Sequence, residues 1–294
     1  MVRGKAEQIL LGSDLKSLQG KVQLIFTSPP FPLNRKKKYG NYSGDQYIAW
    51  LAQFGPLFRG LLKKKGSIVI ELGNAWEPGR PVMSTLALRA LLSFKELGGF
   101  ELCQEFICHN PARLPTPAQW VTIERIRFKD SYTRLWWLAK TDRPKASNRH
   151  VLKEYSPSMQ RLLRTGKYNA GKRPAGHDIG KKSFLVNHGG AIPPNVLTIS
   201  NTRSGDIYQE YCRKHGLLAH PARMPKEVAE FFIRFLTSPG DWVMDPFAGS
   251  NTTGAVAESL KRHWISFEPD KGYIRGSRGR FGRSKETISS ATRG

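Results

Sequence analysis

The chain has 294 residues, of which 47 are Lys or Arg and 23 are Asp or Glu, so its net charge is +24. A hydrophobic content of 39% supports a folded core, and the positive surplus favours a polyanionic partner, with a solvated basic surface as the alternative. No window approaches the roughly 18 apolar residues of a membrane span, and the first residues lack a signal-peptide run, so we expect a cytoplasmic protein without membrane contact.

Short apolar runs alternate with amphipathic segments along the chain. The apolar runs predict strands at Val22–Phe26, Ser67–Leu72, Glu105–Cys108, Leu135–Ala139, Trp242–Met244 and Trp264–Phe267. The amphipathic segments predict helices at Asp45–Leu62, Met83–Leu97, Lys226–Leu236 and Thr252–Lys261. This alternation favours an α/β fold in which helices cover both faces of a mostly parallel sheet.

The first predicted strand runs into a proline-rich loop, Thr27-Ser28-Pro29-Pro30-Phe31. Each proline fixes φ, lacks a backbone donor and holds the preceding residue extended. The loop therefore presents carbonyls, a hydroxyl and an aromatic face at the end of a strand. These groups can hold a flat heterocycle, because carbonyls accept from an exocyclic amino group while the Phe31 ring stacks on the base. An ordinary proline-rich turn remains the alternative.

Two further regions are rich in basic residues. Residues 141–188 contain many Lys, Arg, Ser, Pro and Gly residues and few apolar runs, which predicts an irregular insert at the edge of the sheet or a flexible basic loop. Residues 276–294 predict a basic, disordered tail. We therefore expect one domain from residues 1–140 and 189–275. The three cysteines offer no closed set of zinc ligands with neighbouring histidines, so no metal is expected.

A second loop of small residues follows the strand at Trp242–Met244. It reads Asp245-Pro246-Phe247-Ala248-Gly249-Ser250-Asn251-Thr252-Thr253 and leads into a predicted helix, where the backbone can approach a ligand and helix-start amides attract its negative group. Glu268 ends the next strand, at roughly the 20-residue spacing from which an acidic residue binds ribose hydroxyls. The glycine fingerprint of dinucleotide sites is absent. An adenosyl ligand with a carboxylate and no phosphate, S-adenosylmethionine, fits this loop. The alternative interpretation is a tight strand-to-helix turn of the kind found in any α/β protein.

Together the two loops resemble those of the β-group amino DNA methyltransferases, close to the PvuII-type N4-cytosine-specific enzymes. The resemblance implies a Rossmann-like fold with a seven-stranded sheet, a circularly permuted motif order and a target-recognition insert at residues 141–188. It implies methyl transfer from S-adenosylmethionine to the N4 amino group of a flipped-out cytosine in double-stranded DNA, with S-adenosylhomocysteine as product, in restriction-modification. Adenine-N6 methylation and a non-catalytic nucleic-acid-binding protein with the same fold remain alternatives.

The motifs and the resemblance together assign roles to individual residues. The predicted catalytic residues are Ser28, Pro29, Pro30 and Phe31, with the Ser28 hydroxyl and the Pro29 carbonyl accepting the amino hydrogens. The predicted cofactor-binding residues are Asp14, Thr27, His220, Asp245, Phe247, Gly249, Ser250, Asn251, Thr252, Thr253 and Glu268. The predicted DNA-binding residues are Arg35, Lys36, Lys37, Lys38, Tyr39, Arg173, His177, Asp178, Lys181 and Lys182. His220 is equally suited to cap a helix, and residues 176–180 are equally suited to form a turn. Glu71, Gly73 and Asn74, at the end of a predicted strand, are weaker site candidates.

Overall fold

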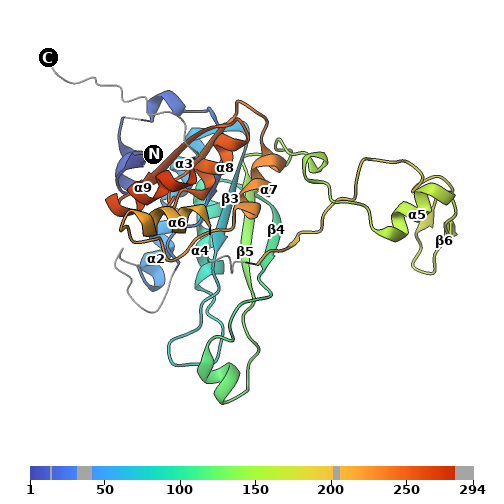
Figure 1. The fold of residues 1–294 in the computed structure, drawn as a ribbon, viewed down its shortest axis with the longest axis horizontal. Helices are drawn as coiled ribbons and strands as arrows, with labels where there is room; N and C mark the ends of the chain where they lie inside the picture. Colours follow the sequence, from blue (N-terminus) through green and yellow to red (C-terminus); the bar gives the residue numbers. More distant parts are fainter. Residues whose placement is uncertain (14, 32–41, 201–205, 282–294) are drawn as a thin grey trace. The chain divides into compact units, whose positions relative to one another are not determined.

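The computed structural model describes residues 1–13, 15–31, 42–200 and 206–281 (Figure 1). The chain divides into two compact units, one formed by Met1–Lys145 and Asn195–Gly294 and the other by Ala146–Pro194. The insert therefore begins and ends a few residues later than the expected 141–188. At its start, Lys145 belongs to the larger unit because its ammonium group lies 2.6 Å from Asp241. At its end, Ala191 pairs with Lys153 inside the insert.

The larger unit is built on an eight-stranded sheet with the order β1-β10-β9-β2-β3-β5-β4-β8. The strands are β1 (Val2–Arg3), β2 (Val22–Thr27), β3 (Leu62–Leu72), β4 (Glu101–His109), β5 (Tyr132–Ala139), β8 (Val196–Thr198), β9 (Trp242–Asp245) and β10 (His263–Glu268). Neighbours are parallel except that β5 is antiparallel to both β3 and β4. The predicted mostly parallel sheet is confirmed.

The number of strands differs from the predicted seven. All six strands assigned from apolar runs are present, and the edge strands β1 and β8 complete the eight. Each edge strand has three residues or fewer, too short for a periodic pattern, and forms by pairing with β10 or β4.

Helices cover both faces of this sheet (Figure 1). They are α1 (Ala6–Leu11), α2 (Gly44–Ala52), α3 (Phe54–Leu61), α4 (Leu86–Gly98), α6 (Ile207–Lys214), α7 (Lys226–Leu236), α8 (Thr252–Ser259) and α9 (Lys271–Ser277). One core cluster packs Phe54, Phe58 and Phe94 of α3 and α4 against the sheet, and the other packs Phe232 of α7 against Phe26 and its neighbours. Because both faces are covered, β2 is buried along its whole length, including the polar side chains of Gln23 and Thr27.

Two predictions are wrong, one about a helix and one about the C-terminal tail. The single helix expected at Asp45–Leu62 is two helices, because Pro56 cannot donate to the carbonyl of the preceding turn, and the chain breaks at Gln53. The tail expected to be disordered from residue 276 is ordered as far as Phe281, since α9 continues into a short 3-10 helix, Arg278–Arg280. Gly276 and Gly279 are buried there against Cys212 and Tyr211 of α6, which holds this segment in place.

The insert has its own small elements. A helix, α5 (Pro157–Thr165), begins at Ser156, whose hydroxyl accepts from the Met159 amide at 3.3 Å. Two short strands, β6 (Gly171–Lys172) and β7 (Asp178–Ile179), pair antiparallel. Among the residues described in both units, no helix is long and apolar enough to cross a membrane.

Candidate active site

The two loops singled out in the sequence meet at one edge of the sheet. Strands β10, β9, β2 and β3 are neighbours and parallel, so their carboxyl ends lie at the same edge. The proline-rich loop leaves β2 after Thr27, and the small-residue loop leaves β9 after Asp245. In open α/β sheets ligands bind in the crevice at this edge.

Asp245 joins the two loops directly. Its Oδ1 accepts from the Thr27 hydroxyl at 2.7 Å and from the Phe247 amide at 3.1 Å, and its Oδ2 accepts from the Thr253 hydroxyl at 2.7 Å. Burial raises the pKa of this carboxyl, while the three donors oppose the shift. Since the Thr253 hydroxyl donates its proton to Asp245, it has none to give to a ligand. Asp245 and Thr253 thus set the relative position of β2, β9 and α8.

The proline-rich loop is joined to β3 through a second carboxylate. The Ser28 hydroxyl forms a side-chain hydrogen bond with Glu71, near the end of β3, and Thr133 of β5 forms another. Burial raises the pKa of Glu71, whereas these hydrogen bonds and the nearby charge of Arg113 lower it. A hydroxyl that donates to Glu71 keeps its oxygen lone pairs free to accept from another group.

Phe31 has its ring against the backbone of Gly73. A Cβ atom at Gly73 would lie 2.6 Å from Cδ2 of the ring, so any larger residue there would displace it. The end of β3 therefore holds both Ser28, through Glu71, and Phe31, through Gly73. The sequence marked Glu71 and Gly73 only as weak candidates, and their position at a strand end was the one available signal.

The carboxylate of Glu268 binds the turn of the small-residue loop. Its Oε2 accepts from the Gly249 amide at 3.0 Å and its Oε1 accepts from the Asp270 amide at 2.9 Å. The residue is 7% exposed, and burial raises the pKa of its carboxyl to about 7. Each oxygen has a further lone pair, so the group can still accept two hydroxyl donors such as those of a ribose.

His220 lies over the same turn. Gly249 has φ +50, and a Cβ atom at this position would be 3.0 Å from the His220 ring. The His220 amide donates to the Tyr208 hydroxyl at 2.8 Å, which fixes the segment before α7. The N-cap of α7 is Pro225, so His220 does not cap that helix. His220 therefore lies against Gly249 of the small-residue loop, and its cofactor-binding role stays a prediction.

Asn251 is the most unusual side chain of this loop. It adopts left-handed backbone angles, φ +57 and ψ +42, which asparagine tolerates better than most residues. It is fully buried, and neither its amide nitrogen nor its amide oxygen has a hydrogen-bond partner among the described residues. Buried polar groups are normally satisfied, so this orphaned amide fits a loop that completes its hydrogen bonds with a ligand.

The sequence did not indicate one group that holds this loop, Arg280. Its Nε donates to the Ser250 carbonyl at 2.7 Å, its Nη2 donates to the Ser250 hydroxyl at 2.8 Å, and its guanidinium lies 4.5 Å from the Tyr208 ring centre. Since Arg280 falls in the segment predicted to be a disordered tail, no sequence pattern marked it. The two buried glycines before it, Gly276 and Gly279, were the only local hint of close packing.

Comparison with known proteins identifies the family. A family model described as DNA methylase matches residues 22–278, which is most of the chain and contains both loops. The chain belongs to the DNA methylase family.

Relatives of this DNA methylase agree in sequence and in fold. It is 43% identical over 277 residues to the type II methyltransferase M.PvuII of Proteus hauseri, covering 92% of this chain and 82% of that protein. It also resembles the solved structure of the cytosine-N4-specific PvuII DNA methyltransferase, with a TM-score of 0.75 and 37% identity over 98% of this chain and 87% of that chain. A protein of Thermus thermophilus, solved with S-adenosyl-L-methionine, shares the fold at 19% identity and a TM-score of 0.57, covering 96% and 92% of the two chains.

Of the DNA-contacting residues predicted for this DNA methylase, those in the insert fall within the described residues. Asp14 of the cofactor prediction and the basic run Arg35, Lys36, Lys37, Lys38 and Tyr39 fall outside the described residues. In the insert, the Arg173 amide donates to the His177 carbonyl at 2.8 Å, so the segment between β6 and β7 is a turn. Gly176, with φ +82, lies within it.

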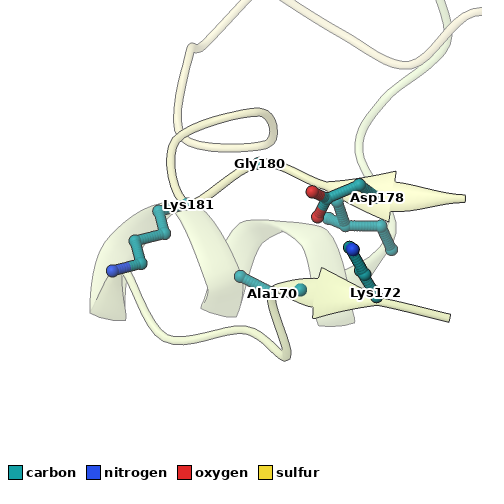
Figure 2. A pocket seen from close by; sticks show the side chains of 7 residues that line it. Ala170, Lys172, Asp178, Gly180 and Lys181 are labelled. Carbon is teal, nitrogen blue, oxygen red and sulfur yellow. The ribbon is translucent and has the colours of Figure 1, made fainter.

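This hairpin lines a pocket of the insert. The lining residues are Ala170, Gly171, Lys172, Asp178, Ile179, Gly180 and Lys181 (Figure 2). Asp178 and Lys172 are partners across the two strands, whereas the Lys181 side chain extends away from the hairpin. The predicted residues therefore differ in surroundings, since Asp178 faces a neighbouring cation and Lys181 extends outward. Among the described residues, no group of His, Cys, Asp and Glu side chains could hold a metal ion.

Proposed function

We propose that this DNA methylase transfers a methyl group from S-adenosylmethionine to the N4 amino group of a cytosine in double-stranded DNA. The observation that carries the proposal is the Ser28 hydroxyl, held by Glu71 beside the Phe31 ring, at the sheet edge that also bears the Asp245 and Glu268 loops. The likeness to the cytosine-N4-specific PvuII enzyme supports the choice of base. We place the reaction in the cytoplasm, as the protecting half of restriction-modification.

The residues at the edge fit the cofactor. Glu268 has one free lone pair on each oxygen for the ribose hydroxyls, and Gly249 leaves room for the His220 ring to lie against the turn. The orphaned amide of Asn251 and the hydroxyls of Ser250 and Thr252 suit the amino-acid end of the cofactor. We keep Asp14 and Phe247 beside the adenosyl group, where the sequence assigns them. When bound, S-adenosylmethionine supplies an electrophilic methyl group.

The proline-rich loop binds and orients the target base. Cytosine N4 is a weak nucleophile, because its lone pair is delocalised into the ring, and in the duplex the base is stacked and paired. Flipping the base out costs a few kcal/mol. The Ser28 hydroxyl and the Pro29 carbonyl accept the two amino hydrogens, which directs the nitrogen lone pair out of the ring plane, and Phe31 stacks on the ring. Alignment of the two reactants then supplies much of the rate.

Glu71 controls the proton at Ser28. An ionised Glu71 accepts a hydrogen bond from the Ser28 hydroxyl, so the serine oxygen faces the base as an acceptor. Burial raises the pKa of Glu71, which increases its basicity and suits it to take up, through Ser28, the proton that leaves the amino group after methylation. Thr27 contributes indirectly, because its bond to Asp245 fixes where the loop begins.

The insert at residues 146–194 is the proposed target-recognition unit. Its hairpin presents Arg173, His177 and Asp178 near a turn, and Lys181 and Lys182 follow it. Base edges carry the sequence information of DNA and phosphates carry none. We assign base contacts to the hairpin residues and phosphate contacts to the two lysines. We assign phosphate contacts beside the flipped base to Arg35, Lys36, Lys37 and Lys38. We assign Tyr39 to stacking on an exposed base or filling the gap that the base leaves.

The test combines base analysis with a serine variant. Plasmid DNA from a methylation-free host expressing the protein is digested to nucleosides and analysed by mass spectrometry. We expect N4-methylcytosine, whereas N6-methyladenine would overturn the choice of base. Ser28→Ala is expected to abolish methylation and keep S-adenosylmethionine binding, and Ser93→Ala on α4 is the control. A wild-type protein that binds DNA and cofactor without any turnover would identify a non-catalytic binding protein instead.

A further inference from the structure

The segment between β4 and β5, residues 110–131, projects from the sheet with an apolar tip. We call it the arm, and Figure 1 shows it in green extending beyond the ends of the strands. Phe128 is 95% exposed, and Leu114 and Ile123 are 75% and 68% exposed. Three large apolar side chains exposed on one short segment make the arm a candidate binding surface.

The arm is a built structure rather than a loose loop. Its tip is closed by the Trp120 carbonyl, which accepts from the amides of Ile126 and Arg127 at 2.9 and 3.1 Å. The Trp120 ring lies 5.4 Å from the ring of Trp76, and Arg127 Nε donates to the Pro81 carbonyl at 2.7 Å. The loop after β3 therefore supports the arm from one side, and Phe128 remains outside these contacts.

The backbone at the tip is also strained. Arg125 has φ +58, a left-handed conformation that is uncommon for a long side chain. Such a residue costs free energy unless the surroundings hold it, and strained residues cluster at functional positions.

Charge selects the kind of partner. The tip alternates apolar and basic residues in the run Arg125-Ile126-Arg127-Phe128-Lys129. A second copy of the chain would bring another net charge of +24 against this face, which disfavours self-association. Duplex DNA complements the tip, because its phosphates can pair with the basic side chains and its flat base faces can contact the apolar ones.

The arm leaves the sheet at the edge that carries the proposed base pocket. Strand β4 ends at His109 and β5 begins at Tyr132, and this edge is also where β3 ends and the loop with Ser28 begins. Arg113, near the base of the arm, lies close enough to Glu71 to lower the pKa of its carboxyl. A duplex with its target base at Ser28 therefore passes beside the arm.

We propose that the arm inserts the Phe128 ring into the base stack of the DNA beside the target base, while Arg125 and Lys129 contact the flanking phosphates. This inference rests on the proposed function, because it assumes a duplex at the strand-end site. Apolar side chains that enter a base step unstack and kink the duplex. An opened step makes it easier to turn out the neighbouring base, which is the costly event before methylation.

The experiment measures binding and unstacking without relying on turnover. Duplexes that bind the wild-type protein are selected from a random pool, and their thymines are probed with permanganate, which oxidises unstacked bases. Phe128→Ala is expected to weaken binding on the order of tenfold, as for one lost stacking contact, and to remove a permanganate-reactive step. Phe128→Trp should restore both. Leu97→Ala, at a residue 59% exposed on α4, is the control for loss of a surface apolar group.

The outcomes separate the inference from the proposed function. Cofactor affinity by calorimetry should be the same in all variants, since Phe128 is on the arm and not on the small-residue loop. Unchanged DNA affinity and permanganate reactivity in Phe128→Ala would overturn the inference. The inference would also be overturned if sedimentation showed that the wild type is a dimer, that Phe128→Ala is a monomer, and that both bind DNA equally. A wild type that lacks methylation activity but shows the Phe128-dependent step would instead overturn only the proposed function.

Discussion

Replacing Glu268 with glutamine should change how stability depends on pH. Burial raises the pKa of this carboxyl from 4.5 to about 7, although the hydrogen bonds from the Asp270 and Gly249 amides oppose the shift; the nearby charges of Asp270 and Asp245 add a smaller increase. At about 1.4 kcal/mol per pH unit, keeping the ionised group buried costs about 3 kcal/mol. The folded protein holds the proton more tightly than the unfolded chain does. The stabilisation is therefore complete below pH 4.5 and is lost as the pH rises through about 7.

The glutamine variant removes this dependence and adds a constant cost. One glutamine oxygen cannot accept from both the Gly249 and Asp270 amides, so one donor loses its partner at a cost of about 1–3 kcal/mol at every pH. The informative quantity is thus the difference between wild type and Glu268→Gln as a function of pH. Buried titratable groups that do not interact with Glu268, such as Glu71, largely cancel in that difference.

The assay is urea unfolding followed by tryptophan fluorescence from pH 5 to 8. We expect the wild type to lose most of about 3 kcal/mol relative to the variant over this range. Parallel stability curves for the two proteins would refute the reasoning, because they would show that Glu268 does not titrate differently in the folded state.

The same group predicts a proton linkage in cofactor binding. Ribose hydroxyls donate to the ionised carboxylate, so binding lowers the pKa of Glu268 and releases a proton below about pH 7. Affinity for S-adenosylmethionine should rise with pH up to about 7 and then level off. Calorimetry in two buffers of different ionisation enthalpy detects the released proton in the wild type and none in Glu268→Gln.

Three further predictions address the other loops. Phe31→Ala should keep cofactor affinity but lose most turnover, since base stacking contributes about 1–3 kcal/mol, and Gly73→Ala should reproduce the effect because its Cβ displaces the ring; full activity in either variant contradicts the stacking role. Arg280→Ala should weaken cofactor binding in calorimetry on the order of tenfold and leave DNA affinity unchanged, because charged hydrogen bonds to the small-residue loop are lost. Neutralising Lys181 and Lys182 should lower the slope of log affinity against log salt by about 0.9 per phosphate contact. A changed sequence preference with the same slope would argue for base contacts instead.

Local patterns were sufficient for the framework of the fold. Apolar runs located six strands and predicted the parallel sheet, because strands covered on both faces need continuous apolar residues. The proline-rich loop and the small-residue loop were recognisable for the same reason, since proline, glycine and hydroxyl residues restrict the backbone wherever they stand. Even the break at Gln53 was present in the sequence as Pro56, although the amphipathic pattern outweighed it.

By itself the sequence determined the two loops, the strands that carry them and the family resemblance, all of which depend on short stretches of chain. Only the tertiary structure decided which side chains meet across those stretches. The bond between Ser28 and Glu71 and the bonds from Arg280 to Ser250 link residues on different elements. So does the pairing of β1 with β10. Such contacts follow from the packing of the whole sheet. A short stretch of sequence indicates which secondary structure it prefers, but not which distant residue its side chains will contact.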